Sequence, residues 1–154
     1  CAYKDDLTPV LEKIESADAV ILGSPIYFSE VTGEMRSFME RLIFPYLVYD
    51  KNYSSLNEKK KPIGLIYTGN VPESMIKEVE YDRILSRYEN LFEKFMGPTE
   101  SLFVTDTYQF SDYSKYVATA FDESAKAKRR QEEFPKDCEK AFEMGIRFVS
   151  NTLE

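Results

Sequence analysis

Hydrophobic and polar positions follow two alternating patterns along this chain. Three short, mainly apolar runs lie at Ala19–Gly23, Ile63–Tyr67 and Ser101–Thr105. Between these runs, apolar side chains recur every three or four residues, which places them on one face of a helix. The pattern therefore predicts buried strands that alternate with amphipathic helices.

Four helices are predicted from this spacing. They are Leu7–Ser16, a helix from Met35 to Ile43 that Thr32 caps, a long helix that starts near Pro72, and Pro135–Thr152. Proline suits the first turn of a helix, and Gly97-Pro98 should end the long one. Cys138 shares the apolar stripe of the last helix and is expected to be buried by packing.

Strands that alternate with helices indicate an α/β protein whose parallel sheet is covered on both faces. We expect residues 1–154 to form a single domain. Three strands are few, because such sheets usually contain about five or six. The sequence also begins with Cys1 rather than Met. We therefore expect that a strand, a helix and a second strand, roughly 40 to 50 residues, precede this sequence.

Composition excludes several classes of function. The chain has 27 acidic and 20 basic residues, for a net charge of −7, which argues against nucleic-acid binding. It has no apolar run of 18 residues to span a membrane and no signal peptide, so a cytoplasmic location is expected. It also has no His, which excludes a catalytic triad, an imidazole base and a His metal ligand within these residues.

Two segments follow predicted strands and are candidates for a ligand site. In open α/β sheets, ligands bind beyond the carboxyl ends of the strands. Ser24–Ser29 and Tyr67–Asn70 combine turn residues, which expose backbone amides, with aromatic rings that can stack on a planar ligand. On pattern alone, the alternative is that Pro25 and Gly69 only turn the chain while the rings pack in the core.

The first of these segments carries a family resemblance. Ala17–Phe28 reads ADAVILGSPIYF, and Val31–Arg41 reads VTGEMRSFMER. Both resemble the NAD(P)H-dependent FMN reductase and iron–sulfur flavoprotein branch of the flavodoxin-like superfamily. Arg36 replaces the family's usual Lys, and Glu40 replaces the usual Asp before Arg41.

The resemblance implies a flavodoxin-like three-layer α/β/α fold with FMN bound at the strand ends. One wall of the flavin site would be Ser24, Pro25, Ile26, Tyr27, Phe28 and Ser29, and the other Tyr67, Thr68, Gly69 and Asn70. NAD(P)H would be the co-substrate, and a quinone, free flavin or redox partner protein the acceptor. No catalytic side chain is expected, because the flavin carries the hydride chemistry. The alternatives are a non-enzymatic electron carrier and a cofactor-free interaction module.

The remaining expectations concern accessory features. Cys1 aligns with the last Cys of a run that ligates a [4Fe–4S] cluster in some members of the branch, but a cluster needs four thiolates. The family's phosphate-binding loop does not occur in this sequence. The resemblance also implies a homodimer or homotetramer.

Two further segments have alternative interpretations. Lys126–Arg130 is predicted to be a solvated helix face, with the phosphate of NADPH or an acidic partner as alternatives. The Tyr-rich stretch 108–121 is a subunit contact, a lid or ordinary packing.

Overall fold

The computed structural model describes residues 4–151 and confirms the alternation of strands and helices. The elements follow in the order α1 (Thr8–Ser16), β1 (Val20–Tyr27), β2 (Glu30–Val31), α2 (Gly33–Ile43), β3 (Ile63–Thr68), α3 (Tyr81–Phe95), β4 (Thr99–Val104), α4 (Glu123–Glu132) and α5 (Phe134–Asn151). Short 3-10 turns lie at Phe44–Tyr46, Glu73–Met75 and Tyr113–Lys115. No helix within residues 4–151 is long and apolar enough to cross a membrane.

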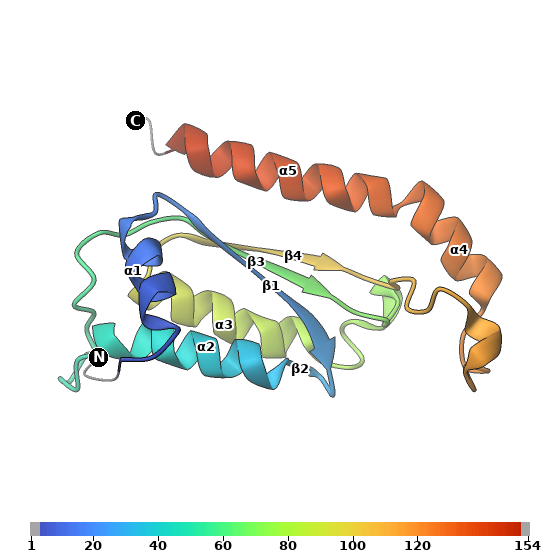
Figure 1. Ribbon diagram of the computed structural model, residues 1–154, viewed down its shortest axis with the longest axis horizontal. Helices are drawn as coiled ribbons and strands as arrows, with labels where there is room; N and C mark the ends of the chain where they lie inside the picture. The colour runs from blue at the N-terminus through green and yellow to red at the C-terminus, as the bar shows by residue number, and fades with distance from the viewer. Residues whose placement is uncertain (1–3, 152–154) are drawn as a thin grey trace.

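The sheet has four strands in the order β2-β1-β3-β4. β1 pairs with β3, and β3 with β4, in parallel, whereas the two-residue β2 pairs antiparallel with the end of β1. Figure 1 shows α2 and α3 on one face of the sheet and α5 on the other. The predicted α/β sheet with helices on both faces is therefore confirmed.

The main core lies between the sheet and the layer of α2 and α3. Ile63 and Leu65 of β3 and Phe92 of α3 are completely buried. The predicted stripe of α3 points inward, because apolar residues at helical spacing share one face. Met39 of α2 is buried against the same core.

The opposite face of the sheet receives α5 at close range. A Cβ atom on Gly64 of β3 would lie 2.7 Å from Sδ of Met144 and 3.1 Å from the ring of Phe148. Both of these α5 side chains are buried. Glycine at position 64 therefore lets the helix approach the sheet this closely.

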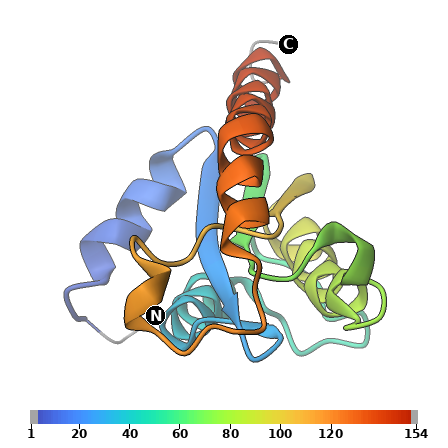
Figure 2. The same cartoon turned by 90° about the vertical axis from the view of Figure 1, so that its right-hand side faces the viewer.

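α1 lies beside β1, as Figure 2 shows, and a buried lysine contacts the end of this helix. The ammonium group of Lys61 donates to the carbonyl oxygens of Ile14 and Glu15, at 2.6 and 2.8 Å. Both carbonyls belong to the last helical turn, where few backbone N–H groups remain to donate to them. The carbonyl of Ile14 also accepts from the N–H of Ala17 at 3.2 Å. Burial lowers the pKa of the Lys61 ammonium.

Three sequence predictions are wrong in detail. The long helix starts at Tyr81 rather than near Pro72, because Glu80 has a left-handed backbone with φ of 57°. A separate helix, α4, precedes α5. Cys138 is exposed on α5 and is not buried by packing. It lies next to Asp137, which is the buried member of that turn.

Candidate functional site

The two predicted ligand segments meet at one edge of the sheet. Pro25 of β1 is the register partner of Thr68 of β3, and Thr68 is the partner of Val104 of β4. Because the three strands are parallel, their carboxyl ends lie side by side, as the arrowheads in Figure 1 show. The segments that follow these strands therefore form a common surface, which we call the carboxyl edge.

The segment Ser24–Ser29 is mostly strand rather than loop, so that part of the prediction is wrong. β1 continues to Tyr27, and only Phe28 and Ser29 form the turn. Pro25 has no N–H to donate, which restricts it to sheet edges. The strand β2 begins to pair with β1 only at Ile26, one residue beyond Pro25. The proline is thus accommodated without loss of a hydrogen bond to β2.

The turn at Phe28 and Ser29 has an unusual backbone. Both residues are left-handed, with φ of 50° and 65°. Two-residue hairpins favour this conformation but normally place Gly or Asn there. The ring of Phe28 is fully exposed, and Tyr27 is 60% exposed. Within residues 4–151, neither the Phe28 nor the Ser29 backbone N–H donates to a protein acceptor.

Ser24 lies inside the sheet and connects β1 to α2. Its hydroxyl donates to the carbonyl of Pro25 at 2.8 Å and accepts from the backbone N–H of Thr32 at 3.1 Å. Thr32 in turn caps α2 by accepting from the backbone N–H of Met35. Ile26 is buried in the core. The side chains of Ser24 and Ile26 therefore connect the strand next to the turn to α2 and to the core.

Tyr67 presents only its backbone to the carboxyl edge. Its side chain points into the core and is 2% exposed, and among the described residues its hydroxyl has no hydrogen-bond partner. Burial raises the pKa of this hydroxyl well above its usual value, and the carboxylate of Glu89 adds to the shift. The neighbouring Tyr88, by contrast, donates to Oε1 of Glu30 at 2.6 Å and accepts from Arg36.

Gly69 is bonded to the segment that follows β4. Its N–H donates to the carbonyl of Val104 at 2.9 Å, and its carbonyl accepts from the N–H of Thr107 at 3.0 Å. A Cβ atom on Gly69 would lie 3.0 Å from the ring of Phe103, so the turn is closely packed there. The two segments after β3 and β4 therefore form one bonded unit.

Asn70 turns its side chain toward the protein. Its amide nitrogen donates to Oε1 of Gln109 at 3.2 Å, and its amide oxygen accepts from Lys126. The backbone N–H of Asn70 donates to no acceptor among the described residues. This residue therefore offers a backbone donor, rather than its side chain, to the carboxyl edge.

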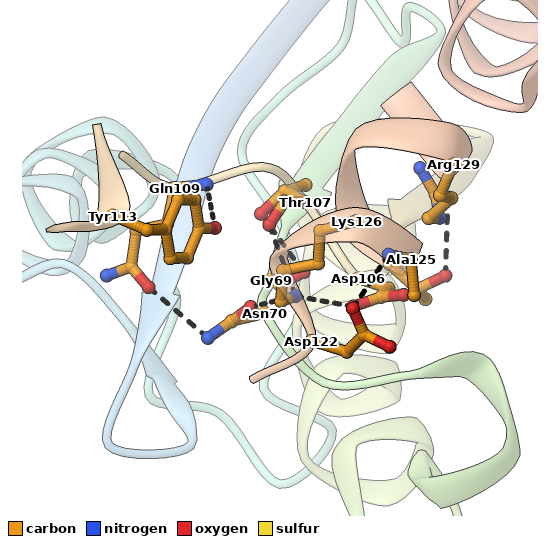
Figure 3. Close-up of polar contacts among 11 residues, drawn as sticks. Gly69, Asn70, Asp106, Thr107, Gln109, Tyr113, Asp122, Ala125, Lys126 and Arg129 are labelled. Carbon is orange, nitrogen blue, oxygen red and sulfur yellow. Dashed lines mark hydrogen bonds and ion pairs between the residues drawn. The ribbon is translucent and has the colours of Figure 1, made fainter. Parts of the chain in front are cut away.

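Lys126 is a residue at the carboxyl edge that sequence reasoning misplaced. It was predicted on a solvated helix face, but it is 4% exposed and points from α4 toward the carboxyl edge. Figure 3 shows its ammonium group between Asn70 and Asp106. Asp106 follows β4 as Asn70 follows β3, but nothing in this spacing points to position 126 as the cation that they share.

Two cavities lie near these turns. The larger, of about 760 Å³, is a groove between α2 and α3, with Glu30 and Tyr88 in its lining. The smaller, of about 260 Å³, is lined by Thr107–Ser111 together with Arg129, Arg130 and Phe134. Neither cavity is lined by any of the ten predicted site residues. The smaller cavity nevertheless adjoins the carboxyl edge, because Thr107 and Gln109 in its lining are hydrogen-bonded to Gly69 and Asn70.

The described residues do not fit an iron–sulfur cluster. Cys1 lies outside residues 4–151, and Cys138 is a free, exposed thiol on α5. No group of three or more His, Cys, Asp or Glu side chains in the described part of the chain could hold a metal ion. A cluster would need four thiolates in one place.

Short matches connect the chain to iron–sulfur flavoproteins. The chain is 46% identical over 41 residues to an iron–sulfur flavoprotein of Archaeoglobus fulgidus, a match that covers 27% of this chain and 20% of that protein. It is 44% identical over 41 residues to one from Methanocaldococcus jannaschii, with 27% and 21% covered. The match thus spans about a fifth of the length of these relatives.

Solved structures share the fold. An NAD(P)H:quinone oxidoreductase from Methanothermobacter marburgensis superimposes with a TM-score of 0.58 at 13% identity, covering 74% of this chain and 59% of that one. A putative quinone reductase from Klebsiella pneumoniae gives 0.57 at 18% identity, covering 84% and 56%. This likeness confirms the flavodoxin-like α/β/α fold. The model of the NADPH-dependent FMN reductases matches residues 1–87, more than half of the sequence, and the chain therefore belongs to that family.

Proposed function

We propose that this chain binds FMN at the carboxyl edge and that the protein acts as an NAD(P)H-dependent oxidoreductase. Membership of the NADPH-dependent FMN reductase family supports both the cofactor and the co-substrate. The observation that carries the proposal is the combination of free backbone donors and exposed rings at one edge of the sheet. The donors are the N–H groups of Phe28, Ser29 and Asn70, and the rings are those of Tyr27 and Phe28.

This arrangement fits the ring system of a flavin. A bound flavin accepts hydride from a nicotinamide, and the protein's task is to bind, orient and tune it. The backbone N–H groups of Ser29 and Asn70 would donate to the polar edge of the ring system, which favours negative charge there. The ring of Phe28 would cover a flat face and exclude water. No imidazole base is needed, in agreement with the absence of His.

The proposal assigns the flavin ring, not the phosphate, to these residues. The chain contains no Gly-, Ser- and Thr-rich loop of the kind that holds a phosphate at a helix N-terminus. Each binding experiment uses the full-length protein. The ten site residues differ in role within the proposal, because Ser24, Ile26 and Tyr67 keep their side chains in the protein interior.

Two further parts of the proposal concern partners. The acceptor in the proposal is a small molecule, a quinone or a free flavin; the similarity in fold to two quinone reductases supports the quinone. The assembly is a homodimer or homotetramer, as the family resemblance implies. Light scattering of the full-length protein measures the assembly directly. Turnover with a quinone and with free FMN identifies the acceptor.

The rival function is a non-enzymatic electron carrier. Anaerobic mixing of the FMN-loaded protein with NADPH or NADH separates the two. Rapid bleaching of the flavin absorbance near 450 nm, on the order of seconds or faster given typical turnover rates, is the result expected of an oxidoreductase. Flavin that stays oxidised with both nucleotides, and is reduced only by a partner protein, would establish the carrier.

A further inference from the structure

A buried lysine joins two turns at the carboxyl edge. Lys126 lies on α4, far along the chain from β3, and is 4% exposed. Its ammonium group donates to the amide oxygen of Asn70, to Oδ1 of Asp106 at 2.5 Å, and to the carbonyl of Thr107 at 3.4 Å. All three of its donors are thus directed at residues that follow β3 or β4.

These contacts hold the backbone of both turns. Asp106 has a left-handed φ of 49°, and its N–H donates to the carbonyl of Val71 at 3.0 Å. Thr107 donates to the carbonyl of Gly69 through its N–H and also through its hydroxyl. The lysine therefore closes a ring of contacts around two adjoining turns, as Figure 3 shows.

The position of α4 is itself fixed, so the lysine acts from a rigid element. Asp122 caps α4 by accepting from the backbone N–H of Ala125 at 3.1 Å. The hydroxyl of Ser124 lowers the pKa of the Asp122 carboxyl by a hydrogen bond. One turn further along α4, Arg129 pairs with the buried Asp137 of α5 at 2.8 Å. The first turn of α4 is thus capped, and the ion pair connects its second half to α5.

We propose that Lys126 is a positioning residue of the flavin site, acting through Asn70. The ammonium group fixes the Asn70 side chain on the protein side, and this orients the turn so that the Asn70 backbone N–H faces the carboxyl edge. A mobile Asn70 would lose this donor and could turn its own amide toward the ligand. This inference rests on the proposed function, because it concerns the same flavin site. Lys126 itself lies outside residues 1–87, the part of the chain that matches the family.

The first measurement needs no cofactor. Amide hydrogen exchange compares Lys126→Met with Lys128→Met, which makes the same change at an exposed lysine of the same helix. We expect the amides of Gly69, Asp106 and Thr107 to exchange about tenfold faster in K126M than in the wild type, since charge-assisted hydrogen bonds are lost. The amide of Leu65 in β3 should change little. K128M should match the wild type throughout.

The second measurement is a double-mutant cycle on the dissociation constant of FMN for the full-length protein. K126M and Asn70→Ala should each raise this constant about tenfold. The double variant should be no weaker than either alone, because the lysine acts through the asparagine. A merely structural role of Lys126 would make the two effects additive. The difference in visible flavin absorbance between K126M and the wild type should also be reproduced by N70A.

Several outcomes would overturn the inference. They are equal exchange of Gly69, Asp106 and Thr107 in K126M and K128M, uniform acceleration that includes Leu65, or additive effects on FMN binding. If K126M does not fold, Asp106→Asn preserves side-chain size, and unchanged exchange in that variant also contradicts the inference. A wild-type protein that binds no FMN would defeat the proposed function, while the exchange measurement would still decide whether the lysine fixes the turns.

Discussion

Pro25 of β1 and Thr68 of β3 lie side by side as register partners in a parallel pair. Three residues beyond Pro25 comes the exposed ring of Phe28, and two residues beyond Thr68 comes the free backbone N–H of Asn70. Two turns that are about forty residues apart in the sequence are thereby brought to one edge of the sheet. The proposed flavin site depends on this pairing.

The exposed ring of Phe28 should contribute to flavin binding. We expect Phe28→Ala to raise the dissociation constant of FMN about 2- to 10-fold, because an aromatic stacking contact is lost. Fluorescence titration of FMN into the full-length protein measures this. Phe142→Ala removes an exposed ring from α5 and should leave FMN binding unchanged. Equal effects of the two substitutions would exclude a specific role for Phe28.

The left-handed backbone at Phe28 should cost stability. Phe28→Gly removes the same ring as Phe28→Ala but suits a φ of 50°. We therefore expect the glycine variant to be about 0.5–1 kcal/mol more stable than the alanine variant. Chemical unfolding of the two variants compares them directly. A less stable glycine variant would mean that the turn is not left-handed.

The hydroxyl of Tyr67 should contribute nothing favourable to folding. It is buried without a partner among the described residues, so Tyr67→Phe should leave the free energy of unfolding unchanged or raise it by up to about 1 kcal/mol. Tyr88→Phe is the matched control, because it removes a hydrogen bond to the Glu30 carboxylate. That control should lose about 1.5–3 kcal/mol. A large loss in Tyr67→Phe would reveal a hydrogen-bond partner.

The same hydroxyl predicts a dependence on alkaline pH. Burial raises the pKa of folded Tyr67, whereas an unfolded tyrosine ionises near its usual value of about 10. Above that pH the unfolded state releases a proton that the folded state keeps, so the free energy of unfolding falls. Tyr67→Phe should therefore lose stability less steeply than the wild type above about pH 10. Parallel pH profiles would contradict the burial of Tyr67.

The close approach of α5 to the sheet should require Gly64. Gly64→Ala would bring a Cβ atom against Met144 and Phe148, and we expect a loss of about 1–3 kcal/mol from overpacking. Gly145→Ala lies on α5 with no atom within 4 Å of its Cβ position. It should be neutral or stabilise the helix by up to about 1 kcal/mol. Thermal unfolding of both variants makes the comparison.

Hydrophobic periodicity predicts β1, β3, β4, α2 and α5, because each carries apolar residues at the spacing of its element. In α5 only part of this stripe is buried: Met144 and Phe148 pack inward, whereas Phe142, Ile146 and Val149 are exposed. Periodicity misses β2, since a two-residue strand has no period to detect. It also places the start of the long helix too early, because a left-handed Glu80 leaves no pattern in the sequence. The resemblance locates the turns of the candidate site. Neither approach locates Lys126, because a buried lysine depends on acceptors that only the fold brings together.

Backbone amide resonances of the full-length protein during titration with FMN test the central claim most directly. The account predicts that FMN shifts the amide signals of Phe28, Ser29 and Asn70, whose N–H groups are free at the carboxyl edge. Signals at the opposite end of the sheet, such as that of Ile63, should not move. The absence of any shift at saturating FMN, or shifts confined to the groove between α2 and α3, would contradict the account.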